Sequence, residues 1–320
     1  MPNLPALEDP KHILTAGTMT PTVYPPLAEM FFRFVETILG YKCLFTFFDA
    51  ATILVLYLLL RKQGGPPHAV LVYAWNPCVL LSFPLFGHLD SLAIVTLFSA
   101  YLFLEMNSGT TSVVALALSA LSKFFAVVLL PVFLRKTGLR KLPTFLAVMI
   151  LFYLPYASIG LHIFGGLSNF SRDWENNDSV FHLIRWIIPS KQNAEWFSAA
   201  LLAVLLGYVV SKVKSPRAAG LILTGRVLLL SPNAFPWYFT WLVPYLCFFS
   251  TPSWLLMSIT SVLGYAPVVT YAAGQEYRDS PLLLMLEYLL VIAVLGYEVF
   301  RNKLSPQRGL ENVAYAPKAA

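Results

Sequence analysis

Long apolar runs, separated by short polar stretches, dominate the pattern of this chain. An α-helix needs about 20 apolar residues to cross a bilayer. Seven runs are long enough to predict membrane spans: 42–61, 69–86, 89–106, 143–160, 195–212, 253–273 and 281–300. The pattern therefore predicts an all-α fold, a polytopic transmembrane helical bundle.

Short basic loops predict the orientation of these spans, because Lys and Arg favour the cytoplasmic side. Such loops begin at residues 61, 135, 211 and 301. If 111–134 were one helix, the loop at 135 would share a side with Gly87–Asp90. A break near Ser122–Lys123 removes this conflict, and a second is expected at 231–237, where two prolines interrupt an apolar run. The resulting topology has about 11 membrane segments, some of them broken or half-length.

This topology divides the chain into three regions. Residues 1–41 form an outer-face segment that includes an interfacial helix, because `LAEMFFRFVETILG` has apolar residues at helical spacing. Residues 42–303 form the membrane domain and 304–320 a cytoplasmic tail. A long outer stretch is expected over 160–194. Broken helices at membrane depth need protein or water to cover the freed backbone, so we expect an outward-facing cavity.

Composition supports a membrane protein and argues against several other classes. The chain is 58% hydrophobic and 12% charged, with a mean hydropathy of +0.68. Its net charge of +6 comes largely from the short loops rather than from a compact basic patch, so no nucleic-acid partner is expected. Cys43, Cys78 and Cys247 form no CxxC pair and no zinc-ligand spacing, which predicts neither a disulfide framework nor a metal site. No cofactor is predicted.

Ionisable residues at the membrane edge are the first candidates for chemistry. His88 and Asp90 lie in `FPLFGHLDSLAIV`, on an outward turn at the start of a helix. Charged groups at the membrane edge are energetically costly, so they usually have a function or a partner. The alternative is that Asp90 caps the helix and His88 is merely solvated. Lys123, at the expected helix break, is either a ligand for a lipid phosphate or an anchor reaching the interface.

Two charged residues are expected deeper in the membrane, where each would have to form an ion pair or bind a ligand. Arg226 in `LTGRVLLLSP` would bind phosphate or pair with Asp49 or Glu287. Asp49 itself lies about two turns into its helix, so it requires a partner or a function that the sequence does not identify.

The outer stretch contains `NFSRDWENNDSVFHLIRWIIP`, an acid-rich turn followed by a segment with helical apolar spacing. It resembles a lid over a cleft, in which Trp174 would stack on a sugar. Polar residues of this turn would bind sugar hydroxyls: Asp173, Glu175, Asn176, Asn177 and Asp178. The alternative is a solvated loop in which Asp178 caps the next helix.

Four motifs occur in the same order as in one enzyme family. They are `TVYPPLAEMFF`, `WNPCVLLSFPLFGHLDSLAIV`, `SALSKFFAVVLLPVFLRK` and `LLLSPNAFPWYFTWLVPYL`. In this order the chain resembles the bacterial membrane mannosyltransferases of glycosyltransferase family 87, in the GT-C group, over roughly residues 20–250. The resemblance implies a polyprenyl-phosphate sugar donor and an active site on the outer face. It also adds Tyr24, Trp237 and Tyr238 as substrate-binding candidates, although aromatic residues near a membrane surface commonly form an interfacial belt.

The chain departs from this family at its N-terminus. Members usually carry a first transmembrane helix and an outer loop whose aspartate is the catalytic base, and neither is found here. We expect either that an upstream segment completes the site, or that Glu8 or Asp9 in `LEDP` supplies the carboxylate.

These observations lead to one main hypothesis and two alternatives. The main hypothesis is a multi-pass hexosyltransferase of the bacterial inner membrane, expected to move mannose to a glycolipid or glycan outside the cytoplasm. Asp90 and His88 would be catalytic, because transfer needs a group that accepts the acceptor's proton. Lys123 would bind the donor phosphate. The alternatives are a secondary transporter, which also uses broken helices, and an inactive paralogue that binds polyprenyl phosphate without turnover.

Overall fold

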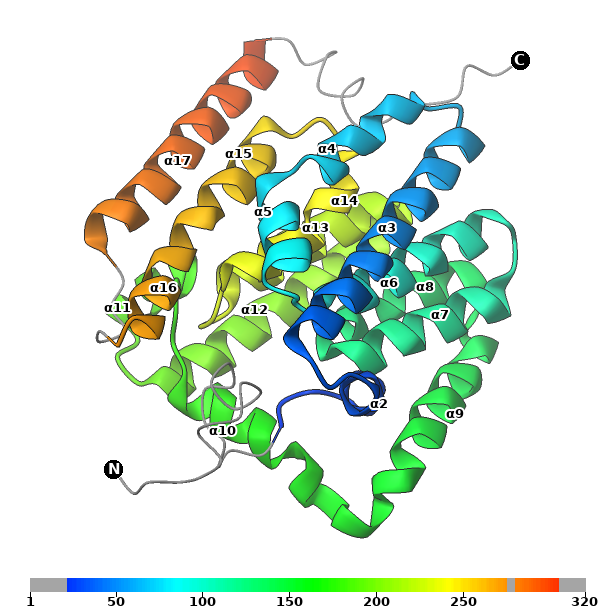
Figure 1. The fold of residues 1–320 in the computed structure, drawn as a ribbon. Coiled ribbons are helices and arrows are strands. Elements are labelled where there is room, and N and C mark those ends of the chain that lie inside the picture. The colour runs from blue at the N-terminus through cyan, green and yellow to red at the C-terminus, as the bar shows by residue number, and fades with distance from the viewer. Residues whose placement is uncertain (1–21, 275–279, 305–320) are drawn as a thin grey trace, which may run out of the picture.

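The computed structural model describes residues 22–274 and 280–304, and these residues form helices without a strand (Figure 1). Five helices are long and apolar enough to cross a membrane, or up to six if one bent pair counts as a span. The expected all-α class and the membrane character are confirmed. The count of 11 segments and the GT-C architecture stay predictions.

The helix near the described N-terminus is shorter than the sequence predicts. Helix α2 (Pro26–Phe34) ends where Val35 becomes extended, and Thr37 begins a new helix by accepting the Gly40 N–H at 3.0 Å. Residues 38–40 therefore belong to the long helix α3 (Ile38–Lys62) rather than to the interfacial helix. The N-cap at Thr37, which satisfies a free helical N–H, decides this boundary.

The span expected over 69–86 is broken. It contains a 3-10 helix (Pro67–Val70), α4 (Leu71–Ala74), α5 (Pro77–Leu80) and a π-helix (Leu81–Leu85). The two halves are bent by 56° at the break. Pro77 has no N–H for the preceding turn, and the Asn76 side chain accepts the Cys78 N–H at 3.0 Å, which starts the second half. A single straight helix was therefore the wrong expectation.

Helices α6 (Asp90–Glu105) and α7 (Gly109–Ser122) form the central antiparallel pair. Serines on α7 donate to backbone carbonyls of α6, from Ser119 to Ala93 at 2.7 Å and from Ser112 to Ala100 at 2.8 Å. Short side chains allow this close approach. Helix α3 packs along α6 on another side.

The predicted break near Lys123 is confirmed. Helix α7 ends at Ser122, Lys123 is extended with φ −156°, and the chain continues as a 3-10 helix (Phe124–Leu129) and α8 (Leu130–Thr137). The second predicted break, at 231–237, is also confirmed. Helix α13 (Pro216–Leu230) ends before it, and a 3-10 helix (Pro236–Trp241) and α14 (Val243–Leu246) follow.

The expected outer stretch is largely helical rather than a loop. Helix α9 (Leu142–Tyr153) continues as 3-10 helix (Leu154–Phe164) with a kink at Gly160, whose φ is +60°, and then as α10 (Gly165–Asp173). Figure 1 shows this stretch as a V that projects below the other helices. The apolar segment predicted as a helix is present as α11 (Ser179–Ile187), and α12 (Lys191–Lys212) follows.

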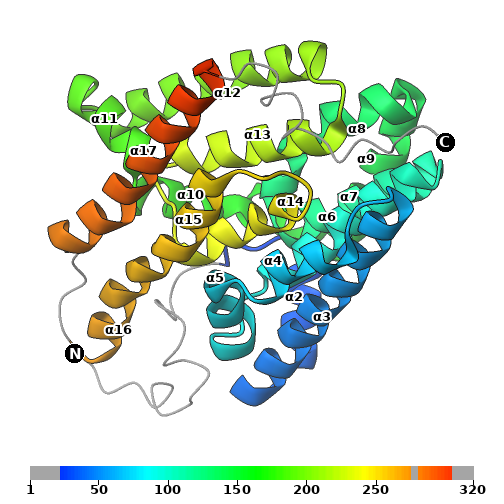
Figure 2. The ribbon, with the colours of Figure 1, turned by 90° about the horizontal axis from the view of Figure 1, so that it is seen from above.

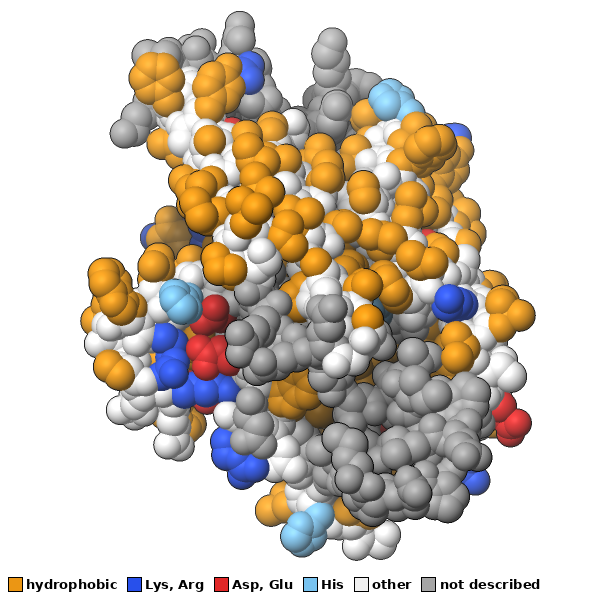
Figure 3. Space-filling model, turned by 60° about the vertical axis from the view of Figure 1, so that its left-hand side comes forward, with side chains coloured by type: hydrophobic (Ala, Val, Ile, Leu, Met, Phe, Trp, Pro, Cys, Tyr) orange, Lys and Arg blue, Asp and Glu red, His pale blue; other side chains and the backbone are white. Residues whose placement is uncertain are grey.

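The C-terminal helices flank the bundle. Helices α15 (Pro252–Thr260) and α17 (Pro281–Leu304) lie side by side (Figure 2), and α16 (Ala266–Ala272) follows α15 after a 3-10 turn. Figure 3 shows hydrophobic side chains over the upper part of one face, while acidic and basic side chains gather in one patch below them. An apolar surface of this kind suits contact with lipid tails.

Candidate functional site

Lys123 and Asp90 form an ion pair where α7 ends and α6 begins. Lys123 Nζ lies 2.5 Å from Asp90 Oδ1, and their side chains are 16% and 2% exposed. The antiparallel packing of α6 and α7 brings these residues together although they are 33 positions apart in the chain. The sequence predicted both as site residues, and the structure places them in contact.

Trp241 completes this contact and was not found from the sequence. Its Nε1 donates to Oδ1 of Asp90 at 2.7 Å, and its ring is fully buried at the end of the 3-10 helix that follows the second break. Among the described residues, no bond goes to Oδ2 of Asp90. A buried tryptophan usually requires an acceptor for its N–H. This requirement was the only feature of the sequence that could have pointed to Trp241. We call Asp90, Lys123 and Trp241 the Asp90 centre.

The helix-cap interpretation of Asp90 is wrong. Asp90 is the first residue inside α6, the cap position is occupied by Leu89, and no side-chain cap bond is made. The anchor interpretation of Lys123 is also wrong, because its ammonium is held by Asp90 instead of extending alone to an interface.

An aromatic ring covers the Lys123 ammonium. Lys123 Nζ lies 4.0 Å from the ring centroid of Tyr238, close enough for a cation–π contact. Tyr24 precedes α2 and lies close enough to Asp90 to feel its charge. Burial, together with the nearby Asp90 carboxylate, raises the pKa of Tyr24. Tyr24 therefore stays neutral and adds no charge to the centre.

His88 lies beside the Asp90 centre in a stack of rings. Its ring is 4.1 Å from that of Trp237 at an angle of 20°, and Trp237 stacks on Phe235 at 4.6 Å. The turn depends on Gly87, whose φ of +70° is easily reached only by glycine. Burial lowers the pKa of His88 to about 4, so the imidazole is neutral near pH 7.

Two aromatic residues of `PWYFTW` make direct contacts with site candidates. Trp237 stacks on His88 and Tyr238 covers Lys123. Both rings therefore lie beside candidate site residues.

The acid-rich outer turn is fixed to the second helix break. Asn176 and Asn233 form a parallel backbone bridge, and the Asn233 side chain donates to the Trp174 carbonyl at 3.0 Å. Asn177 is buried and its amide donates to Glu287 at 3.0 Å. It also accepts the Tyr288 hydroxyl at 2.6 Å. These contacts anchor the turn and occupy the Asn177 groups that were expected to bind sugar.

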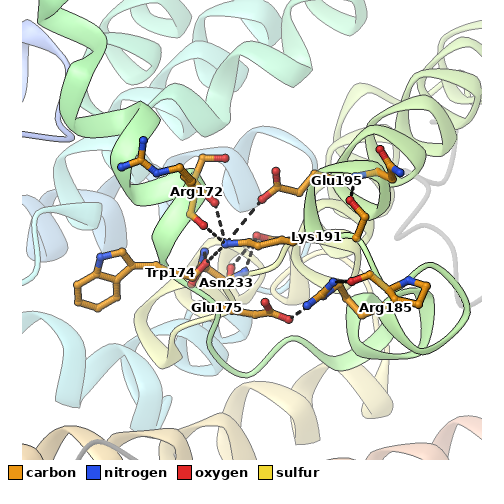
Figure 4. Close-up of polar contacts among 12 residues, drawn as sticks. Arg172, Trp174, Glu175, Arg185, Lys191, Glu195 and Asn233 are labelled. Atoms are coloured by element: carbon orange, nitrogen blue, oxygen red, sulfur yellow. Dashed lines mark hydrogen bonds and ion pairs between the residues drawn. The ribbon is translucent and has the colours of Figure 1, made fainter.

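Lys191 holds the other end of this turn (Figure 4). Its ammonium donates to the carbonyls of Ser171, Arg172 and Trp174 at 2.8, 2.9 and 2.7 Å, at the end of α10. A cation at the C-terminal end of a helix satisfies carbonyls that have no helical partner. Nearby, Arg185 and Glu175 pair at 3.4 Å. The turn is thus held by Lys191 and Arg185, which sequence reasoning had left unassigned, and Glu175, which was expected to bind sugar, pairs with Arg185.

Trp174 remains accessible on this turn, with 41% of its surface exposed, and stacks on Phe170. The side chain of Asp173 lies outside the part that the structure describes. Asp178 occupies the cap position of α11 without a side-chain cap bond and faces His182 at 3.3 Å.

Arg226 lies away from these contacts. It is exposed on α13 and makes no hydrogen bond or ion pair within the described part of the chain. Asp49 instead accepts the Tyr73 hydroxyl at 2.7 Å, and Glu287 accepts the Asn177 amide. The expected pairing of Arg226 with Asp49 or Glu287 is therefore wrong.

Glu8 and Asp9 lie outside the described residues. Across 22–274 and 280–304, no three or more His, Cys, Asp or Glu residues gather as a metal site would need.

No protein-family model matches the chain, and neither does any curated protein or solved structure. The family resemblance consequently stays a prediction that rests on the four motifs.

Proposed function

We propose that this protein is a membrane glycosyltransferase whose Asp90 centre binds the phosphate of a polyprenyl-phosphate sugar. The observation that carries the proposal is the contact of Lys123, at a helix break, with Asp90 and Trp241. Lys123 is the more exposed partner of the pair, so its ammonium is the group that a phosphate can approach.

Asp90 supports this role because it holds the Lys123 ammonium in place. Its carboxylate is 2% exposed and its Oδ1 is bonded to both Lys123 and Trp241. A buried carboxylate held in this way fixes the position of the cation before the ligand arrives, which reduces the cost of binding. As the donor bond breaks, negative charge grows on the leaving phosphate, and a fixed ammonium stabilises it.

His88 is the best-placed acceptor of the proton from the attacking hydroxyl. Its imidazole is neutral, and its ring nitrogens form no hydrogen bonds within the described part of the chain. The ring stack with Trp237 fixes its plane. In this scheme the acceptor oxygen forms a bond to the anomeric carbon, the bond to the phosphate oxygen breaks, and the proton moves to His88.

The substrate proposals follow from the family resemblance. The donor is polyprenyl-phosphate mannose, the acceptor is a glycolipid or glycan, and the centre faces the periplasm or outside of a bacterial inner membrane. About 11 membrane segments in a GT-C arrangement belong to the same proposal. The broken helices at Lys123 and at 231–237 support it, because they create irregular backbone beside the centre.

The experiment is a transfer assay in membranes with and without the chain. Radiolabelled mannose, glucose and arabinose are supplied as polyprenyl-phosphate donors, and label in glycolipid and glycan is counted. We expect transfer from one of the three donors, and mannose is the sugar we expect. This transfer should occur only when the chain is present. Uptake of free sugar or another solute into sealed vesicles, without transfer, would favour the transporter instead.

A further inference from the structure

A polar pocket lies at the N-terminal end of α7, away from the Asp90 centre. Its volume is about 460 Å³. The pocket is lined by Leu104, Asn107, Ser108, Gly109, Thr110, Lys136, Thr137 and Lys141. Gly109 begins α7 and Lys123 follows its last residue. The 14 residues of α7 place the pocket about 20 Å from Lys123 along the helix.

The lining is cationic and rich in hydroxyl groups. Two lysines contribute to it, and no acidic side chain does. Lys141 Nζ donates to Thr110 Oγ1 at 2.6 Å, which holds its ammonium at the pocket. Lys136 is exposed and makes no ion pair within the described residues. Two ammonium groups beside hydroxyl donors match the several oxygens of a phosphate.

The pocket borders an exposed apolar surface. Leu139, between the two lysines, is 76% exposed. Helix α9 begins directly after Lys141, and one side of it is open, because Leu146, Ile150 and Leu151 are 48%, 60% and 62% exposed. If the phosphate of a lipid bound in this pocket, the acyl chains of that lipid would therefore lie against α9.

We propose that this pocket binds the phosphate of an anionic membrane lipid. The two lysines and Thr110 hold the headgroup, and the lipid tails lie against Leu139 and α9. This site is independent of the sugar-transfer proposal, because none of its residues belongs to the Asp90 centre.

The test measures lipid binding to the purified full-length protein in uncharged detergent by native mass spectrometry. The probes are short-chain phosphatidylglycerol, short-chain phosphatidylcholine and inorganic phosphate. Lys136→Ala/Lys141→Ala should bind phosphatidylglycerol roughly 10- to 30-fold more weakly. The matched control Arg140→Ala/Lys212→Ala loses the same charge outside the pocket and should bind like the wild type.

Lys136→Met provides a second variant that removes no hydrogen bond, and we expect roughly 5-fold weaker phosphatidylglycerol binding. Equal loss in the pocket and control variants would overturn the proposal, because it would show general attraction to positive charge. Equal binding of phosphatidylcholine, or displacement of the lipid by equimolar inorganic phosphate, would overturn an anionic lipid as the ligand.

Discussion

Lys123 follows the last residue of α7, and Asp90 is the first residue of α6, so their 2.5 Å contact joins two helix ends of opposite polarity. The N-terminal end of a helix favours an anion and the C-terminal end a cation. Each charge is thus stabilised by its own helix as well as by its partner. This arrangement explains how a largely buried carboxylate and ammonium are retained in an apolar bundle.

Replacing Asp90 should destabilise the protein. Asp90→Asn leaves Lys123 without its counter-charge, and breaking one partner of a buried pair costs about 3 kcal/mol. Thermal unfolding in detergent should therefore begin at a lower temperature than in the wild type. The double variant Asp90→Asn/Lys123→Met removes both charges and should recover part of this loss. An additive loss in the double variant would argue against coupling between the two residues.

Trp241→Phe should isolate the contribution of a single hydrogen bond. The phenyl ring fills most of the buried space but cannot donate to Asp90, which should cost about 1–3 kcal/mol. Donor binding should weaken less than in Lys123→Met, because the ammonium remains. Trp196→Phe, at an exposed ring on α12 outside the candidate site, serves as the control for both measurements. A Trp241→Phe protein with wild-type stability would show that this bond contributes nothing.

His88 should make the folded state sensitive to acid. Its pKa is about 4 in the folded protein against 6.5 for an ordinary histidine. Between these values the unfolded state binds more protons, so stability falls as the pH is lowered through this range. His88→Phe keeps the ring contact with Trp237 and should show a weaker dependence. Unfolding curves between pH 7.5 and 4 for both proteins measure the difference, and identical slopes would assign the acid sensitivity elsewhere.

Cysteine labelling tests the proposed sidedness. In a Cys43→Ser background, Ser168→Cys on α10 should react with a membrane-impermeant thiol reagent applied outside intact cells. Thr137→Cys, at the last residue of α8, should react only after the cells are opened. The opposite pattern would invert the topology and place the Asp90 centre on the cytoplasmic side.

Several features of the fold follow from local chemistry and could be predicted. Both broken helices were expected, one from the placement of charged loops around Lys123 and the other from two prolines in 231–237. The bend at Asn76–Pro77 was missed although Pro77 is visible in the sequence. The uninterrupted apolar run indicated one continuous helix there. The missing N–H of Pro77 instead breaks the helix.

The site was predictable only residue by residue. Asp90, His88 and Lys123 were found because ionisable groups are costly in apolar surroundings. Their mutual contact, and the Trp241 bond, depend on how α6, α7 and the second break pack, which no local pattern reveals. Asn177 shows the same limit, because an apparently free loop amide is bonded to Glu287 from the distant helix α17.

The most direct test of the account is donor binding by the purified protein. Polyprenyl-phosphate mannose is titrated against wild type, Lys123→Met and Lys212→Met, with unphosphorylated polyprenol as the ligand control. Loss of one charge-assisted bond to phosphate predicts roughly 10- to 100-fold weaker donor binding by Lys123→Met. Lys212→Met should bind like the wild type, and polyprenol should bind all three proteins equally. Wild-type donor affinity in a folded Lys123→Met protein would contradict the account.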